Sequence, residues 1–376
     1  MTAPRRTLIV TNDFPPRQGG IQSFVHELAI RQPAGSVVVY SSDYAGAREF
    51  DAAAPFPVER HRSGLLLPTP AAARRAVRLL REYGCTAVWF GASAPLGLLA
   101  PALRRAGAQR IVASSHGHEI GWAMLPGARQ VLRRIGRSCD VITYLGEYTR
   151  SRIEPALGAR SRMQELHPGV DADTFSPGVS GSAVRERHGL AGRPVVVCVS
   201  RLVPRKGQDV LIEAMPAVRR AVPGAALLIV GRGPYRDHLE RLAARRGVAG
   251  DVVFTGGVAF ADLPAHYAAG DVFAMPCRTR RAGMDVEGLG IVYLEASAVG
   301  LPVLAGASGG APDAVREGET GYVVDGRDAA AVASRLVTLL QDAPLRGRLG
   351  AAGRAWVERE WRWDVVAARL RALLDG

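Results

Sequence analysis

Lysine is almost absent from this chain of 376 residues: 47 of its 48 basic residues are arginine, and Lys206 is the exception. Because alanine and glycine are also abundant, the excess of arginine first indicates a compositional bias under which surface lysines would be replaced. A position that keeps lysine against this bias indicates a need for a compact ammonium on a flexible stem, which a planar guanidinium does not offer. The alternative is that Lys206 has remained a lysine by chance.

Long hydrophobic runs and paired cysteines are missing as well. No stretch of eighteen apolar residues occurs, and the opening "MTAPRRTLIVTNDF" passes from two arginines into a short apolar strand. We therefore expect neither a membrane-spanning helix nor a secretory signal. The four cysteines lie far apart and form no Cys-x-x-Cys pair, which is typical of reduced core residues in a cytosolic protein.

The charge balance is strongly basic, with a formal net charge of +13. Such an excess indicates a polyanionic neighbour, either nucleic acid or an anionic membrane surface, and composition does not choose between them. With 48% hydrophobic and 22% charged residues the chain is neither disordered nor embedded in a membrane. Its length favours two domains.

Apolar strands alternate with helical patterns along almost the whole sequence. In the first half we predict strands over residues 7–12, 36–42, 86–91, 110–117 and 140–146. Continuous apolar strands separated by helices indicate a parallel sheet covered on both faces. The segment "LHPGVDADTFSPG" (166–178) has no strand or helix period, so we interpret it as a linker.

The alternation resumes after this linker with six further strand patterns, and helices are predicted over about 206–222, 235–246 and 289–299. The fold class that follows is α/β, with two doubly wound, Rossmann-like domains whose ligand would lie in a cleft between them. We expect an N-terminal domain over 1–170, a C-terminal domain over 171–355, and a helix over 356–376 that packs toward the N-terminal domain.

Two strand-to-helix loops have the composition of phosphate sites. Gly19 and Gly20 enter a helix directly after a strand, where free backbone N–H groups and the positive helix end attract an anion; a plain turn is the alternative. In "SRLVPRKGQDVL" (200–211) the cations Arg201 and Lys206 occupy a similar loop and can hold a diphosphate between them. Solvated surface charge is the alternative there.

The stretch "MDVEGLGIVYLEASAVG" (284–300) carries two carboxylates eight residues apart, Glu287 and Glu295. On a helix they would be on the order of 12 Å apart, too far for the opposed acid and base of a glycoside hydrolase. They can instead hold two ends of one ligand whose phosphate lies at the helix N-terminus. For Glu295 an ordinary solvated helix glutamate is the alternative.

These motifs occur in the order seen in the retaining glycosyltransferases of family four, which have the two-domain GT-B fold. The sequence resembles this family over essentially its whole length, through "EGLGIVYLE", "VSRLVPRKGQD" and "TNDFPPRQGGIQSF". Together with "ASSHGHEIGW" and "MPCRTRRAGMDVEGLGIV", they are most similar to the actinobacterial GDP-mannose-dependent phosphatidylinositol-monomannoside mannosyltransferases. Leu289 departs from the more frequent "EGFG", which we expect to alter packing near the sugar.

The resemblance implies a role for each matched position. Arg201 and Lys206 would bind the donor diphosphate, with Gly19 and Gly20 against the donor phosphates or the acceptor. Glu295 would bind the nucleotide ribose. The remaining implied positions are Glu287 with Gly288, Leu289 and Gly290 at the donor sugar and phosphate, Val258 beside the base, and His118 at the reacting face of the sugar, where a supporting core histidine is the alternative.

The same resemblance implies the partners. The donor would be GDP-mannose and the acceptor a phosphatidylinositol mannoside, which would receive a second mannose in α-1,6 linkage. The family normally works without a metal or other cofactor, and "HGH" shows no third metal ligand in the sequence. We therefore expect no metal, and we expect a cytoplasmic protein peripherally attached to the inner face of the plasma membrane.

A basic amphipathic helix is predicted over 70–84, in "PAAARRAVRLLREYG", with Arg74, Arg75, Arg78 and Arg81 at helical spacing. Such a helix can lie on an anionic membrane surface, and a solvated helix is the alternative. Three other functions remain open: a family-four enzyme with another donor or acceptor, a nucleotide-sugar epimerase on the same fold, and a nucleic-acid-binding protein. The last lacks any recognisable nucleic-acid motif, so we expect no nucleic-acid partner.

Overall fold

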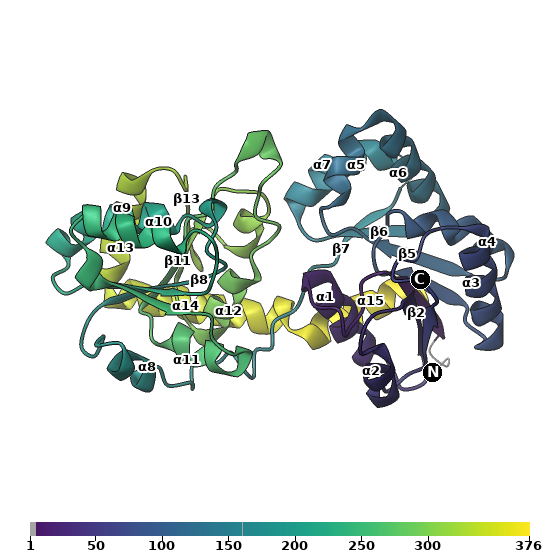
Figure 1. Ribbon diagram of the computed structural model, residues 1–376, viewed down its shortest axis with the longest axis horizontal. Coiled ribbons are helices and arrows are strands. Elements are labelled where there is room, and N and C mark those ends of the chain that lie inside the picture. The colour runs from purple at the N-terminus through teal and green to yellow at the C-terminus, as the bar shows by residue number, and fades with distance from the viewer. Residues whose placement is uncertain (1–4, 160) are drawn as a thin grey trace. The chain divides into compact units, whose positions relative to one another are not determined.

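The chain forms two compact α/β units in the computed structural model, which describes residues 5–159 and 161–376 (Figure 1). Unit 1 consists of the residues up to 169 together with 363–376, and unit 2 consists of residues 170–362. The main chain therefore leaves unit 1 after residue 169 and returns to it at Trp363. The predicted α/β class with two Rossmann-like parallel sheets is confirmed.

The sheet of unit 1 has seven parallel strands in the order β3-β2-β1-β4-β5-β6-β7. Their bounds are β1 Thr7–Thr11, β2 Val37–Ser42, β3 Val58–His61, β4 Ala87–Phe90, β5 Arg110–Ser114, β6 Val141–Tyr144 and β7 Met163–Glu165. The sequence patterns predict the five inner strands and miss β3 and β7. These two are edge strands with one neighbour each, and their half-exposed residues form no continuous apolar run.

Side chains of unit 1 strands alternate between two cores, as the period of two requires. Leu8 and Val10 of β1 enter the core beneath α3 (Pro70–Glu82), α4 (Ala100–Arg105) and α6 (Pro126–Ser138). Ile9 enters the opposite core, beneath α1 (Gly20–Ile30) and α15 (Trp363–Asp375). The last helix of the chain thus covers one face of the first sheet (Figure 1).

Unit 1 also contains further helical segments. They are α2 Ala47–Ala53, the 3-10 turn η1 Leu96–Leu99, α5 Glu119–Met124 and α7 Glu147–Leu157. α5 and α6 are consecutive, joined at Leu125 and Pro126.

The sheet of unit 2 has six parallel strands in the order β10-β9-β8-β11-β12-β13. The strands are β8 Val195–Val199, β9 Ala226–Val230, β10 Val252–Gly256, β11 Val272–Met275, β12 Val303–Gly306 and β13 Gly321–Val324. The α-helices are α8 Ser182–Arg187, α9 Gln208–Ala221, α10 Arg236–Arg245, α11 Leu263–Ala268, α12 Ile291–Val299, α13 Ala329–Gln341 and α14 Ala343–Trp356. A π-helical segment, Val357–Trp361, follows α14 and still belongs to unit 2.

All four cysteines are buried and unpaired. Burial raises the pKa of Cys139 and of Cys198 to about 12, so both remain thiols at neutral pH. Within residues 5–159 and 161–376, no helix combines the length and the apolar character needed to cross a bilayer.

Candidate functional site

The candidate donor residues cluster at the carboxyl edge of the unit 2 sheet, where parallel α/β sheets bind ligands. The loop after β8 carries Arg201 and Lys206, in very different surroundings. Arg201 is exposed, and its guanidinium makes no ion pair with any residue that the structure describes. Lys206 is buried, because its loop runs tightly against the end of β11. At Gly207, which has φ +77°, a Cβ atom would lie 2.0 Å from the carbonyl oxygen of Pro276.

Lys206 forms an ion pair with Glu287, one of the two acidic residues predicted for the site. The ammonium Nζ lies 2.6 Å from Glu287 Oε2, and both side chains are at most 10% exposed. Glu287 is fixed through its backbone, since its carbonyl accepts a hydrogen bond from Gly310 N–H at 2.9 Å. The fold therefore brings together two predicted residues that are far apart in sequence.

Two further charged residues belong to this cluster and were missed in the sequence. Arg205 Nε lies 3.8 Å from Glu287 Oε2, and Arg205 Nη1 lies 3.6 Å from Asp285 Oδ1. Arg205 directly precedes Lys206, and Asp285 lies two residues before Glu287, so closeness in sequence to predicted positions was the available signal. The cluster thus contains the cations Lys206 and Arg205 and the carboxylates Glu287 and Asp285, and Arg280 Nη1 lies 3.8 Å from Asp285 Oδ2.

The glycine-rich turn after Glu287 leads into α12, whose N-cap is Gly290 with φ +83°. A Cβ atom at Gly290 would lie 2.4 Å from the ring of Tyr293, so a larger residue would not fit this turn. Gly288 is exposed, and Leu289 turns its side chain into the unit 2 core with 5% exposure. Only the backbone of Leu289 is thus available at the loop, beside the free N–H groups that begin α12.

Glu295 lies within α12 and contacts a buried tyrosine. The hydroxyl of Tyr267 donates a hydrogen bond to Glu295 Oε2 at 2.5 Å. Burial raises the pKa of the Glu295 carboxyl, and this hydrogen bond partly offsets the shift. Glu295 is therefore half-buried and hydrogen-bonded, which differs from the freely solvated glutamate considered from sequence. Val258, in the loop after β10, is partly buried against the same core.

The remaining predicted residues lie in unit 1. Gly19 and Gly20 are exposed at the start of α1, and a Cβ atom at Gly19 would clash with Gln22 Oε1 at 2.1 Å. That side chain is held by its amide Nε2, which donates to Asp13 Oδ1 at 2.7 Å. The Gly19–Gly20 loop is therefore fixed by a local hydrogen bond at the carboxyl edge of the unit 1 sheet.

His118 is 40% exposed at the same edge and lies beside a buried carboxylate that the sequence did not indicate. Glu119, 1% exposed, accepts hydrogen bonds from the hydroxyls of Ser93 and Ser115 and from His116 N–H. Its Oε1 lies 3.4 Å from His118 Nε2. Glu119 thus ties the ends of β4 and β5 to the segment that carries His118.

The neighbouring His116 is held more tightly than His118. Its Nε2 lies 2.6 Å from the carbonyl oxygen of Gly91, and its ring packs edge-on against Phe24. Burial lowers the pKa of His116, although Glu119 opposes the shift. His116 is therefore the supporting core histidine of the "HGH" motif, whereas His118 is the accessible one.

The arginines of α3 do not form a uniform exposed surface. Arg74, Arg78 and Arg81 are exposed, whereas Arg75 pairs with Glu59 at 2.5 Å. The apolar residues Ala76, Leu79 and Leu80 between them are buried in the unit 1 core. In the described residues we find no group of three or more histidine, cysteine or acidic side chains placed to hold a metal ion.

Comparison with known proteins is in keeping with this arrangement. The family described as Glycosyltransferase Family 4 matches residues 18–174, and the family Glycosyl transferases group 1 matches residues 182–356. A GDP-mannose-dependent alpha-(1-6)-phosphatidylinositol monomannoside mannosyltransferase of Mycobacterium tuberculosis is 55% identical over 378 residues, covering 99% of this chain and 98% of its own. A GDP-mannose-dependent monoacylated alpha-(1-6)-phosphatidylinositol monomannoside mannosyltransferase of Corynebacterium glutamicum is 48% identical, covering 100% and 99%.

Solved structures with the same fold are more distant in sequence. Anabaena HepE in complex with UDP superimposes with a TM-score of 0.79 at 20% identity, covering 98% of this chain and 99% of that one. Sucrose-phosphate synthase from Thermosynechococcus elongatus gives a TM-score of 0.73 at 21% identity, with 98% of each chain covered.

Proposed function

Because the chain belongs to the family-four glycosyltransferases, we propose that it is a retaining α-mannosyltransferase that transfers mannose from GDP-mannose to a phosphatidylinositol mannoside. The observation that carries the proposal is the identity of 48% and 55%, over essentially full length, to relatives that bear this activity in their names. The product would carry its second mannose in α-1,6 linkage.

The donor half of the reaction is assigned to unit 2. Arg201 and Lys206 bind the diphosphate, and their charges offset the negative charge that develops on the leaving group. Glu287 and the N–H groups of the turn Gly288–Gly290 hold the sugar and its phosphate. Glu295 binds the ribose, and the backbone near Val258 borders the base. The mutual contact of Lys206 and Glu287 supports this assignment.

The acceptor half is assigned to unit 1, where His118 is accessible beside Glu119 and the Gly19–Gly20 loop is fixed nearby. In the reaction the bond between the anomeric carbon and the diphosphate oxygen breaks. A bond from that carbon to the acceptor hydroxyl oxygen forms, and the hydroxyl proton leaves with GDP. We place the protein at the cytoplasmic face of the plasma membrane, because the acceptor named for its relatives is a lipid.

One experiment separates this function from other donors and acceptors. The purified protein is incubated with a panel of radiolabelled nucleotide sugars and phosphatidylinositol mannoside dispersed in detergent, and organic-soluble label is counted. We expect transfer from GDP-mannose. Transfer only from a UDP-sugar, or only into a water-soluble product, would contradict the assignment, and conversion of the nucleotide sugar without any acceptor would indicate an epimerase.

A further inference from the structure

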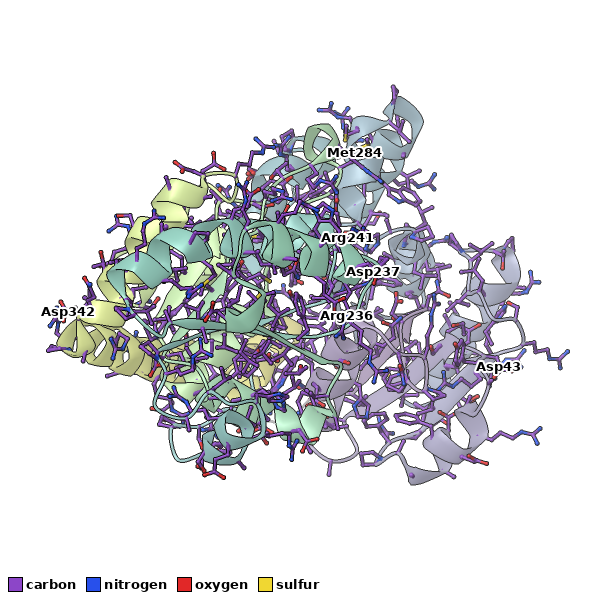
Figure 2. All side chains as sticks on the ribbon, turned by 60° about the vertical axis from the view of Figure 1, so that its left-hand side comes forward. Asp43, Arg236, Asp237, Arg241, Met284 and Asp342 are labelled. Carbon is purple, nitrogen blue, oxygen red and sulfur yellow. The ribbon has the colours of Figure 1, made fainter. Side chains whose placement is uncertain are left out.

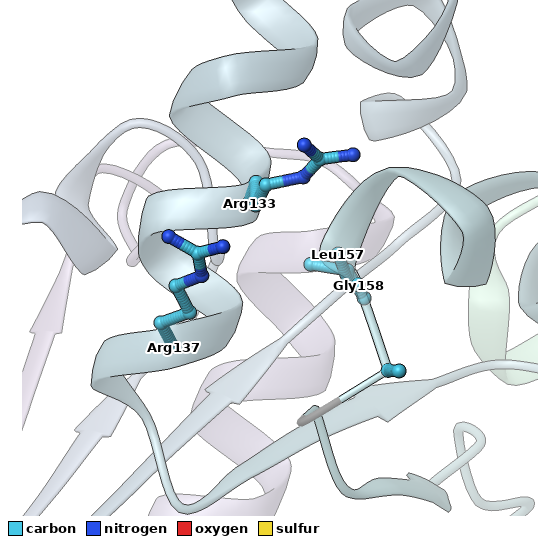
Figure 3. Close-up of a pocket in the computed structure, with 5 residues that line it drawn as sticks. Arg133, Arg137, Leu157 and Gly158 are labelled. Atoms are coloured by element: carbon cyan, nitrogen blue, oxygen red, sulfur yellow. The ribbon is translucent and has the colours of Figure 1, made fainter.

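Arg205 differs from the other arginines of the chain that carry exposed charge, because part of its guanidinium is buried without a hydrogen bond. Its Nε–H is inaccessible to solvent and donates to no acceptor in the part of the chain that the structure describes. A buried donor without an acceptor costs free energy. By contrast, Arg133 and Arg137 on α6 are exposed and line an open pocket, where water can solvate them (Figure 3). The position of Arg205 therefore calls for an explanation.

A buried carboxylate oxygen lies just beyond hydrogen-bond range of this Nε–H. Arg205 Nε is 3.8 Å from Glu287 Oε2, the same oxygen that lies 2.6 Å from Lys206 Nζ. Because a hydrogen bond needs about 3 Å between its heavy atoms, a side-chain movement of about 1 Å would complete it. One carboxylate oxygen thus has one cation in contact and a second cation within reach.

The main chain that carries both cations is fixed, so this movement would involve side chains alone. Arg205 and Lys206 lie in the 3-10 turn Pro204–Lys206. The carbonyl of Arg205 accepts a hydrogen bond from Arg278 N–H at 2.8 Å. The guanidinium of Arg278 in turn donates to both carboxylate oxygens of Asp209, at 3.0 and 2.6 Å, where α9 begins. The turn is therefore held between the segment after β11 and the start of α9.

Asp285 restrains the side chain of Arg205 only loosely and has another cation beside it. Arg205 Nη1 lies 3.6 Å from Asp285 Oδ1, and Arg280 Nη1 lies 3.8 Å from Asp285 Oδ2. The backbones of Arg280 and Asp285 also exchange two hydrogen bonds, at 2.9 and 3.2 Å. The adjacent Met284 is 74% exposed, so solvent reaches this part of the loop (Figure 2). Asp285 would therefore keep a cation and access to water if Arg205 turned toward Glu287.

We infer that Arg205 replaces Lys206 as the partner of Glu287 when the donor diphosphate binds, which leaves the ammonium available for the phosphates. The Glu287 side chain is 8% exposed, and a buried carboxylate that loses its cation is strongly destabilised. Binding of the diphosphate to Lys206 creates this situation unless a second cation compensates. Arg205 is placed to do so, through the Nε–H that otherwise has no acceptor in the described residues.

This inference rests on the proposed function, which assigns Lys206 to the donor diphosphate and Glu287 to the sugar. It makes Arg205 a positioning residue, because the guanidinium acts on the donor through Glu287. The exchange allows both assigned contacts to form at once: the ammonium turns to phosphate while the carboxylate stays charged and fixed beside the sugar. Without the exchange, the contact of Lys206 with phosphate and the ionised state of Glu287 would oppose each other.

Two other roles of Arg205 would give different results on substitution. If the guanidinium contacts the diphosphate directly, its removal weakens GDP binding equally whether or not residue 287 is charged. If Arg205 is an ordinary solvated arginine, its removal changes GDP binding little. The exchange requires instead that the effect of removing Arg205 depends on the negative charge of Glu287.

The test is a double-mutant cycle on the full chain, with GDP affinity measured by titration calorimetry. Arg205→Gln should weaken GDP binding roughly tenfold more in the parent background than in the Glu287→Gln background. The amide needs no cation, so Lys206 is then free to bind phosphate even without Arg205. Arg205→Lys should restore most of the parent affinity, because an ammonium on a flexible stem also reaches the carboxylate. The control is Arg133→Gln in unit 1, the same change at an exposed arginine, which should bind GDP as the parent does.

Equal weakening in the two backgrounds would overturn the exchange, as would unchanged GDP affinity in Arg205→Gln. Urea unfolding checks that Arg205→Gln is folded, and Arg205→Met takes its place in the cycle if it is not. Failure of the proposed function is recognised separately, in the parent protein. Binding of UDP in preference to GDP by the parent would contradict the donor assignment, and the same cycle measured with UDP would still test the exchange.

Discussion

The Lys206 ammonium lies 2.6 Å from the Glu287 carboxylate, so the only lysine of the chain has a carboxylate partner. Both charges are buried, and each needs the other to compensate for the loss of hydration. A donor diphosphate that binds Lys206 must therefore share the ammonium with Glu287 or displace the carboxylate. The effects of substituting Lys206 and Glu287 on donor affinity and on stability are therefore coupled.

Lys206→Ala should reduce both donor affinity and stability, whereas Arg201→Ala should reduce donor affinity alone. Each charge-assisted contact to the diphosphate is worth roughly 1.5–3 kcal/mol, or about 10- to 100-fold in affinity for GDP. Removal of Lys206 also leaves Glu287 buried without its partner, which costs about 3–5 kcal/mol of unfolding free energy. Titration calorimetry and urea unfolding measure the two effects. Lys206→Met combined with Glu287→Gln should recover stability but not affinity, and unchanged GDP affinity in both single variants would remove these residues from the site.

Glu287→Gln should separate binding of the nucleotide from transfer of the sugar. Without the carboxylate, the Lys206 ammonium is no longer neutralised, so we expect GDP to bind several-fold more tightly. Transfer of mannose should fall, on the order of 100-fold, because the variant loses a charged contact to the sugar. Calorimetry with GDP and radiolabel transfer measure the two quantities. Weaker GDP binding in this variant would show that Glu287 does not restrain Lys206.

Glu295→Gln should stabilise the protein more at pH 7 than at pH 4. The folded-state pKa of Glu295 is raised above the ordinary value of 4.5 by burial, so the folded chain binds this proton more tightly than the unfolded chain. Stability therefore falls as pH rises from 4.5 through the folded-state pKa, and glutamine avoids that loss. Urea unfolding of parent and variant across this range provides the measurement, with Glu240→Gln on the exposed face of α10 as the control. A difference independent of pH would contradict the prediction.

Glu119→Gln should change His116 without unfolding the protein, because the amide oxygen can replace Oε2 and accept from Ser115 and from His116 N–H. The amide nitrogen can then donate to the Ser93 hydroxyl, which donates to Oε1 in the parent. The carboxylate opposes the burial effect on His116, so its loss should lower the pKa of that imidazole further. NMR titration of the histidine ring signals measures this shift, with His238 on α10 as an internal reference. If the His116 signal titrates identically in parent and variant, the carboxylate does not act on this ring.

Mannose transfer should survive treatment with EDTA, because arginine, lysine and the start of α12 are proposed to balance the charge of the leaving diphosphate. Initial rates before and after chelation and dialysis provide the measurement. Complete loss of activity that is restored by Mg²⁺ or Mn²⁺ would mean that a metal ion supplies this charge instead.

Local patterns were sufficient to predict the α/β class, the five inner strands of the first sheet, all six strands of the second sheet and the loops that carry most candidate residues. Buried parallel strands form unbroken apolar runs, and strand-to-helix loops are marked by glycine and proline, so both can be recognised in a single stretch of sequence. Lys206, isolated among arginines, and Glu287, before a glycine turn, were recognisable for the same reason.

The contacts between segments that are distant in the sequence were decided only by the tertiary structure. The pairing of Lys206 with Glu287 joins the segments that follow β8 and β11, and Glu119 accepts from serines in the loops after β4 and β5. Helix α15 returns to the first unit after the whole of the second. An amphipathic pattern also does not say what its apolar side faces. On α3 that side faces the core, while the exposed apolar surface is found in short loops that have no period. Burial and charge pairing arise from contacts between segments far apart in the chain, and these contacts exist only once the sheets have formed.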